Sequence, residues 1–178
     1  NVYVADTENN QIKKVDAQGA VTVYAGLGGS SGYGNQDAAD PLKATFKNPN
    51  DVALDDGGNL YVAVAQEGQI RKIAASGEVS TFIQDTDLLD AATGWKLGWS
   101  HGIDVDSSGT VYMVDKSNHL VGAKNAQGKV TLLAGTKSTD GDSDGSALGG
   151  ATFKSLHGVT VSADGQSVYV ADTMNHRI

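Results

Sequence analysis

Three polar residues occupy the same position in three similar segments of the chain. They are Asn50 in Pro49-Asn-Asp-Val, His101 in Ser100-His-Gly-Ile and His157 in Leu156-His-Gly-Val. Imidazole nitrogens bind zinc and other transition metals, so histidines in register could form part of a metal site if the fold brings them together. Asn50 is a poor zinc ligand. The alternative is that the rings hydrogen-bond to neighbouring backbone, and all three residues remain candidates for contact with a ligand or partner.

A second candidate is the acidic loop Asp140-Gly-Asp-Ser-Asp-Gly145. Its alternating carboxylates resemble the first half of a calcium loop, in which glycine permits the sharp turn. The bidentate glutamate expected at the twelfth position is replaced by Ala151, and the equivalent loop at 32–37 keeps only Asp37. The loop therefore predicts either a solvated turn whose side chains bond to their own backbone or calcium bound by three carboxylates, Asp140, Asp142 and Asp144.

Two tryptophans, Trp95 and Trp99, lie in a segment that differs from the other connecting segments and directly precedes His101. Unique tryptophans in a connection are candidates for contact with a ligand or partner. Alternatively, they fill an apolar gap between repeated units. By contrast, Asp6, Asp115 and Asp172 recur in phase, and we expect them to accept hydrogen bonds that hold a turn.

These residues are positioned by a repeat. Four apolar segments align, with starts 58, 51 and 57 residues apart: Val2-Tyr-Val-Ala-Asp6, Leu60-Tyr-Val-Ala-Val64, Val111-Tyr-Met-Val-Asp115 and Val168-Tyr-Val-Ala-Asp172. Around them lie further period-2 runs of about five residues, separated by glycine turns. Each unit therefore reads as a four-stranded antiparallel meander. The predicted fold is all-β, a β-propeller of four-stranded antiparallel blades with about three blades present.

The predicted blade parts and linkers cover the whole of 1–178. The blade parts are 1–25, 46–84, 100–134 and 153–178, and the inter-blade linkers are 26–45, 85–99 and 135–152. Because the first strand of each blade lines the central channel, Asn50, His101 and His157 are expected near one channel mouth. Three blades do not close a ring. We expect either half of a six-bladed ring in a longer chain or two copies that self-associate to close one.

The same residues carry a family resemblance. The segment Tyr169-Val-Ala-Asp-Thr-Met-Asn-His-Arg-Ile178 resembles the signature of NHL repeats, and weaker copies stand at Asn9–Ile12 and Asn118–Leu120; the second blade departs from it at Ala65-Gln-Glu-Gly68. NHL-type propellers include peptidyl-hydroxyglycine lyases, which hold zinc with channel-facing histidines. The resemblance therefore implies, as one alternative, a metal-dependent lyase or lactonase-type enzyme using His101 and His157.

The composition and the absence of known catalytic motifs narrow the range of possible functions. The net charge of −8 disfavours nucleic acid, and no apolar stretch is long enough for membrane insertion. The chain has no cysteine and lacks the Gly-x-Ser-x-Gly, Walker and His-Glu-x-x-His motifs. The leading hypothesis is therefore a non-enzymatic binding or scaffolding propeller module that presents its inter-blade loops to a protein or glycan partner. A calcium-stabilised extracellular structural module is a further alternative. The acidic net charge and the glycine–aspartate loops favour an extracytoplasmic location.

Overall fold

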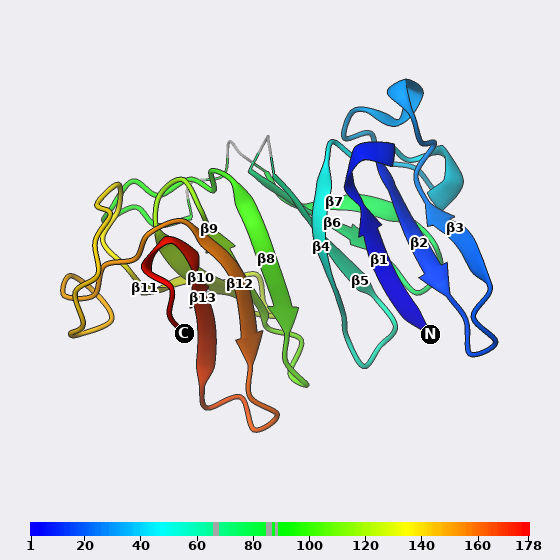
Figure 1. Cartoon of the computed structure of the whole chain (residues 1–178). Coiled ribbons are helices and arrows are strands. Elements are labelled where there is room, and N and C mark those ends of the chain that lie inside the picture. Colours follow the sequence, from blue (N-terminus) through cyan, green and yellow to red (C-terminus); the bar gives the residue numbers. More distant parts are fainter. Residues whose placement is uncertain (66–67, 85–86, 88) are drawn as a thin grey trace.

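The computed structural model describes residues 1–65, 68–84, 87 and 89–178, and it consists of antiparallel sheets. In this described part there is no α-helix, only four short 3₁₀ turns, Thr7–Asn9, Ser30–Gly32, Pro41–Lys43 and Thr173–Asn175. Four sheets stand around a common axis (Figure 1). The all-β propeller predicted from the sequence is confirmed. The turn at 66–67, where the second blade departs from the repeat, and positions 85, 86 and 88 of the second linker lie outside the described residues.

Two blades have all four strands, each ordered in space as in sequence. The second blade contains β4 (Pro49–Leu54), β5 (Leu60–Val64), β6 (Gln69–Ile73) and β7 (Val79–Ile83). The third blade contains β8 (Ser100–Val105), β9 (Val111–Asp115), β10 (Leu120–Lys124) and β11 (Val130–Ala134). This order is the meander that the alternating apolar runs and glycine turns predict.

Two incomplete blades flank them. The first blade contains β1 (Val2–Asp6), β2 (Gln11–Val15) and β3 (Val21–Ala25), and the fourth contains β12 (Leu156–Val161) and β13 (Val168–Asp172). Strands β4, β8 and β12 lie side by side as the inner strands (Figure 1). The chain is thus an arc of a propeller, with each inner strand carrying one candidate channel residue at its start.

Apolar side chains fill the space between successive blades. Ile12, Phe46 and Val62 pack between the first and second blades. Ile70, Trp95 and Met113 pack between the second and third. A third cluster between the third and fourth blades includes Val121 and Leu156. Since a four-stranded sheet has two faces, only stacking against both neighbours removes its apolar surface from water.

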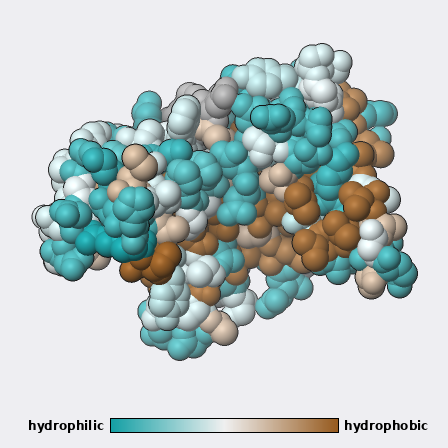
Figure 2. Space-filling model, in the orientation of Figure 1, coloured by the Kyte–Doolittle hydropathy of each residue, from teal (hydrophilic) through white to brown (hydrophobic). Residues whose placement is uncertain are grey.

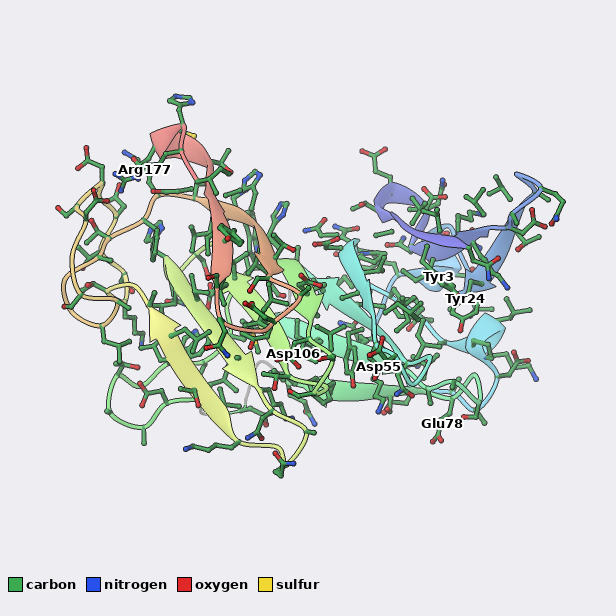
Figure 3. All side chains as sticks on the ribbon, turned by 90° about the horizontal axis from the view of Figure 1, so that it is seen from below. Tyr3, Tyr24, Asp55, Glu78, Asp106 and Arg177 are labelled. Atoms are coloured by element: carbon green, nitrogen blue, oxygen red, sulfur yellow. The ribbon has the colours of Figure 1, made fainter. Side chains whose placement is uncertain are left out.

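The turns from inner to second strand repeat one hydrogen-bonded arrangement. Asp55 Oδ1 accepts from the backbone N–H of Asn59, and Asp106 Oδ1 accepts from that of Thr110. The following tyrosines, Tyr61 and Tyr112, donate their hydroxyls to the same aspartates. Figure 3, seen from below, labels Asp55 and Asp106 at this end of the channel. Tyr61 and Tyr112 therefore stabilise the turn between the inner and second strands of their blades.

One sheet face is largely uncovered. Val2 and Val4 of β1 and Val21 and Val23 of β3 are all exposed, and Figure 2 shows hydrophobic surface over this first sheet. In the described residues, no helix is long and apolar enough to cross a membrane.

Candidate functional site at the channel mouth

The two channel histidines lie directly against each other. His101 begins β8 and His157 begins β12, and both strands have an irregular register at these residues. The strands approach closely because Gly102 has no side chain: a Cβ there would lie 2.5 Å from the carbonyl oxygen of His157. The imidazole rings stack with centroids 4.3 Å apart and an 11° angle between their planes. The sequence predicted both residues at this mouth. The close approach of β8 to β12 brings their rings into a stacked pair.

The surroundings of the pair favour neutral imidazoles. Burial is the largest cause lowering the pKa of His101, followed by the charges of His157 and Lys116. Burial and Lys116 likewise lower the pKa of His157. Both rings are therefore neutral at pH 7, because the ordinary histidine pKa already lies below it.

An exposed tryptophan and a lysine stand beside the histidines. Trp99 is 47% exposed, and its carbonyl accepts from the backbone N–H of Lys116 at 2.9 Å. The ammonium of Lys116 lies 5.8 Å from the centroid of the Trp99 ring. Across the described part of the chain, Lys116 forms no ion pair. The mouth thus combines an aromatic face with a cation that forms no ion pair with a described carboxylate.

Lys116 is the site residue that sequence reasoning missed. It directly follows Asp115, and the turn after β9 places it near the starts of β8 and β12. The available signal was its position: Asp6 and Asp172 are followed by Thr7 and Thr173, so a lysine there departs from the repeat. Asn50, the third expected residue, starts the equivalent register on β4 and is half-buried.

The histidine pair does not have the form of a complete metal site. Parallel rings at stacking distance do not direct both lone pairs at one ion. Within the described ranges, no three histidine, cysteine or carboxylate side chains are grouped so that they could hold a metal.

The acidic loop is tied to the fourth blade. Asp140 lies 3.3 Å from the ammonium of Lys154, and Asp144 lies 3.4 Å from the guanidinium of Arg177. The side-chain amide of Asn175 donates to the carbonyl of Gly141 at 2.6 Å. Two of the three proposed calcium ligands, Asp140 and Asp144, thus face cations, while Asp142 is exposed at the loop surface.

Trp95 is buried rather than presented to a partner, which corrects the expectation of a contact at this residue. Its side chain is 0% exposed, and its ring occupies the space beside Gly122, where a Cβ would collide with it. Its indole N–H donates to Asp115 Oδ2 at 3.0 Å. A large aromatic ring with one polar atom can be buried when that atom finds an acceptor. Of the two tryptophans, only Trp99 is available at the surface.

The strand-end aspartates hold linkers and turns, and Asp115 does so next to Trp99 and Lys116 of the mouth. Asp115 accepts from the backbone N–H groups of Gly98, Ser117 and Asn118. Asp172 accepts from the backbone N–H of Lys154 at 2.7 Å. These bonds join a blade to the linker that precedes it, because Gly98 and Lys154 lie before the inner strands β8 and β12.

Known proteins resemble the chain in both sequence and fold. The family model described as NHL repeat matches residues 153–178. NHL repeat-containing protein 2 of Bos taurus is 27% identical over 96% of this chain and 25% of its own length. The Homo sapiens protein of that name is 28% identical over 84% of this chain and 23% of its own. The chain thus spans about a quarter of the curated relatives it matches.

Solved structures share the architecture at low identity. A structural genomics protein of unknown function from Bacteroides thetaiotaomicron aligns with a TM-score of 0.73 and 18% identity over 98% of this chain and 42% of that one. A streptogramin B lyase aligns with a TM-score of 0.62 and 12% identity over 97% of this chain and 45% of that one. At these identities the likeness concerns the fold alone. Together with the in-phase repeat and the blade structure, the matches identify an NHL repeat at residues 153–178 and support an NHL-repeat β-propeller.

Proposed function

We propose that this propeller segment is a non-enzymatic binding module whose contact surface is the channel mouth. The observation that carries the proposal is the exposed ring of Trp99 beside the ammonium of Lys116, which has no ion-pair partner among the described residues, and the stacked His101–His157 pair. The partner class is a protein or a glycan that presents an anionic or planar group at the mouth.

The chemistry of each group supports this use. A tryptophan provides a large rigid contact area at low cost in conformational entropy. Lys116 attracts an anion because the neighbouring imidazoles are neutral and no carboxylate in the described part of the chain is paired with it. Lys116 therefore presents a positive charge at the mouth of a chain whose net charge is −8, and this charge favours an acidic partner at this end of the channel.

The test is binding to a defined array of neutral and acidic glycans and to a phage-displayed peptide library. We expect the acidic members to bind, with at least a tenfold loss of affinity in Trp99→Ala and in Lys116→Met. Leu54→Ala provides the matched control, since Leu54 is also exposed but ends β4 at the opposite end of the channel. Binding that is equally strong in Trp99→Ala and Lys116→Met would contradict the mouth as the contact surface.

The second candidate is a metal-dependent lyase or lactonase-type activity, favoured by the adjacency of His101 and His157 on inner strands. Measuring zinc in the purified protein by mass spectrometry separates it from the binding module. Stoichiometric zinc that is lost in His101→Ala and His157→Ala would support the enzyme, whereas equal zinc in wild type and variants supports the binding module. The calcium-stabilised module predicts instead a melting temperature that rises with calcium and no longer does so in Asp142→Asn.

A further inference from the structure

The outer edge of the third blade borders an apolar groove far from the channel mouth. Strand β11 forms one wall, residues 89–93 of the second linker form another, and Leu148 with Gly149 closes one end. The groove has a volume of about 490 Å³. The backbone N–H and C=O groups on the side of β11 that faces away from β10 border this groove.

Hydrogen-bonded and non-hydrogen-bonded residue pairs alternate between β10 and β11, and this alternation determines which backbone groups of β11 point outward. Asn125 donates its backbone N–H to the carbonyl of Lys129 at 3.0 Å, so the next pair, Lys124 with Val130, is of the non-hydrogen-bonded type. The N–H and C=O of Val130 therefore point outward, and by alternation those of Leu132 do as well. Among the residues that the structure describes, no backbone group pairs with Val130 on this outer side.

The chain itself shows how such an edge is filled, one blade earlier. Val79 of β7 is the repeat equivalent of Val130. The linker residue Ala38 forms an antiparallel bridge with it: the Ala38 N–H donates to Val79 at 3.1 Å, and the Val79 N–H donates to Ala38 at 2.8 Å. This bridge leaves Val79 1% exposed. An extended segment of the chain therefore docks on this edge of an NHL blade through a pair of main-chain hydrogen bonds, while Asp37 beside it bonds to Arg71 and Thr81.

The second linker does not repeat this arrangement with its described residues. It turns back on itself in a bridge between Asp90 and Trp95, which inserts the Trp95 ring under β10. In the second blade the equivalent space is taken by Arg71, whose guanidinium bonds to Asp37 beside Ala38. The tryptophan thus replaces the arginine–aspartate pair, and the edge position of Ala38 has no counterpart among the described residues of this linker.

We propose that the outer edge of β11 binds an extended segment of a partner polypeptide by antiparallel strand addition. The segment places a small or apolar side chain opposite Val130, as Ala38 does opposite Val79, and an apolar side chain opposite Leu132. Leu89, Ala92 and Leu148 supply the apolar contacts. This mode of recognition combines main-chain hydrogen bonds with pockets for alternate side chains.

The charged residues that line the groove indicate which kind of peptide segment would bind there. Among the described lining residues, two lysines, Lys129 and Lys137, face one carboxylate, Asp90. The groove is therefore net positive in a chain that carries −8 overall. An acidic residue flanking the apolar positions complements this rim, so the occupant is an acidic, extended peptide of a partner protein and not a second copy of this edge, which would bring lysine against lysine.

The experiment selects binders from a phage-displayed library of random seven-residue peptides and compares Val130→Pro with wild type. Proline removes only the outward N–H of Val130, so the bonds between β10 and β11 remain, and edge strands tolerate proline at such positions. The matched control is Val21→Pro, which removes the same outward N–H from β3. We expect apolar–acidic peptides whose affinity falls at least tenfold in Val130→Pro and is unchanged in Val21→Pro.

Two further measurements keep the test decisive. Amide hydrogen exchange should slow at Val130 and Leu132 when a selected peptide binds. If Val130→Pro does not fold, the peptide's own outward N–H is removed by N-methylation, with the same tenfold loss expected. A library that yields no binder, binders indifferent to both changes, or an edge that is occupied by dimerisation in sedimentation experiments would overturn the proposal.

Discussion

At the residue scale, the two tryptophans of the second linker have opposite roles despite standing four positions apart. Trp95 is fully buried, with its indole N–H bonded to Asp115, whereas Trp99 is 47% exposed. The turn at Gly98, whose N–H is also bonded to Asp115, separates them. One carboxylate thus fixes both the buried ring and the backbone that presents the exposed one.

This difference predicts a difference in stability between two identical substitutions. Trp95→Ala should lower the free energy of unfolding by about 3–5 kcal/mol, because it opens a cavity between the second and third blades and removes one of the N–H groups that bond to Asp115. Trp99→Ala should change it by less than about 0.5 kcal/mol. Urea denaturation of both variants checks this, and equal losses would contradict the assignment of one ring to the core and the other to the surface.

The histidine pair predicts a titration that depends on Lys116. Because the charge of Lys116 contributes to lowering both imidazole pKa values, Lys116→Met should raise both toward 6.5 while keeping the apolar stem of the side chain. NMR titration of the ring protons measures this directly. Lys129→Met, which removes a lysine distant from the mouth, is the control and should leave both titrations unchanged.

The same pair predicts how stability varies with pH. A histidine with a folded-state pKa below its unfolded value takes up fewer protons when folded, so stability is lost as the pH falls below 6.5. The double variant His101→Gln/His157→Gln should therefore lose less stability between pH 7.5 and pH 5 than wild type does. Urea denaturation at both pH values tests this, and an unchanged difference would show that other groups cause the acid sensitivity.

At the element scale, carboxylates join inner strands that belong to different sheets. Asp51 on β4 accepts from the backbone N–H of Ile103 on β8 at 3.1 Å. Asp104 on β8 accepts from the backbone N–H of Val161 and the hydroxyl of Thr160 on β12, both at 2.8 Å. Neighbouring blades are thus connected by side chain-to-backbone bonds in addition to their apolar contacts.

Removing one of these connections should loosen a single interface. Asp104→Ala leaves the N–H of Val161 without its acceptor, at a cost of about 1–3 kcal/mol. We expect faster amide hydrogen exchange at Val161 and unchanged exchange at Ile103, whose acceptor is Asp51. Equal acceleration at both amides would indicate that Asp104 stabilises the inner strands in general rather than this interface.

At the scale of the whole molecule, the arc of blades exposes the apolar face of its first sheet. Val2, Val4, Val21 and Val23 are exposed there (Figure 2). Exposed apolar surface of this kind favours association. We expect chain 1–178 to self-associate in sedimentation velocity experiments as its concentration rises.

The double variant Val4→Lys/Val23→Lys tests whether this face is responsible, because it adds charge to the sheet without touching the inter-blade cores. It should sediment as a monomer under the same conditions. Leu42→Lys, at an exposed position outside the sheets, is the control and should associate as wild type does. Association that persists in the double variant would place the contact elsewhere.

The sequence by itself determined the blades. Strands such as Val111–Asp115 and the turns before them follow from period-2 apolar alternation and glycine, which are local properties of five to ten residues. In-phase recurrence also separated repeat-maintaining residues such as Asp172 from candidates for function. Both inferences succeed because each blade must solve the same local problem of pairing four strands.

Only the tertiary structure decided what the candidate residues do. The stacking of His101 on His157 and the burial of Trp95 depend on how closely one blade approaches the next. That distance is set by contacts between residues more than fifty positions apart, such as Gly102 against His157. Local sequence patterns carry no information about such spacing, because it emerges only when whole blades pack.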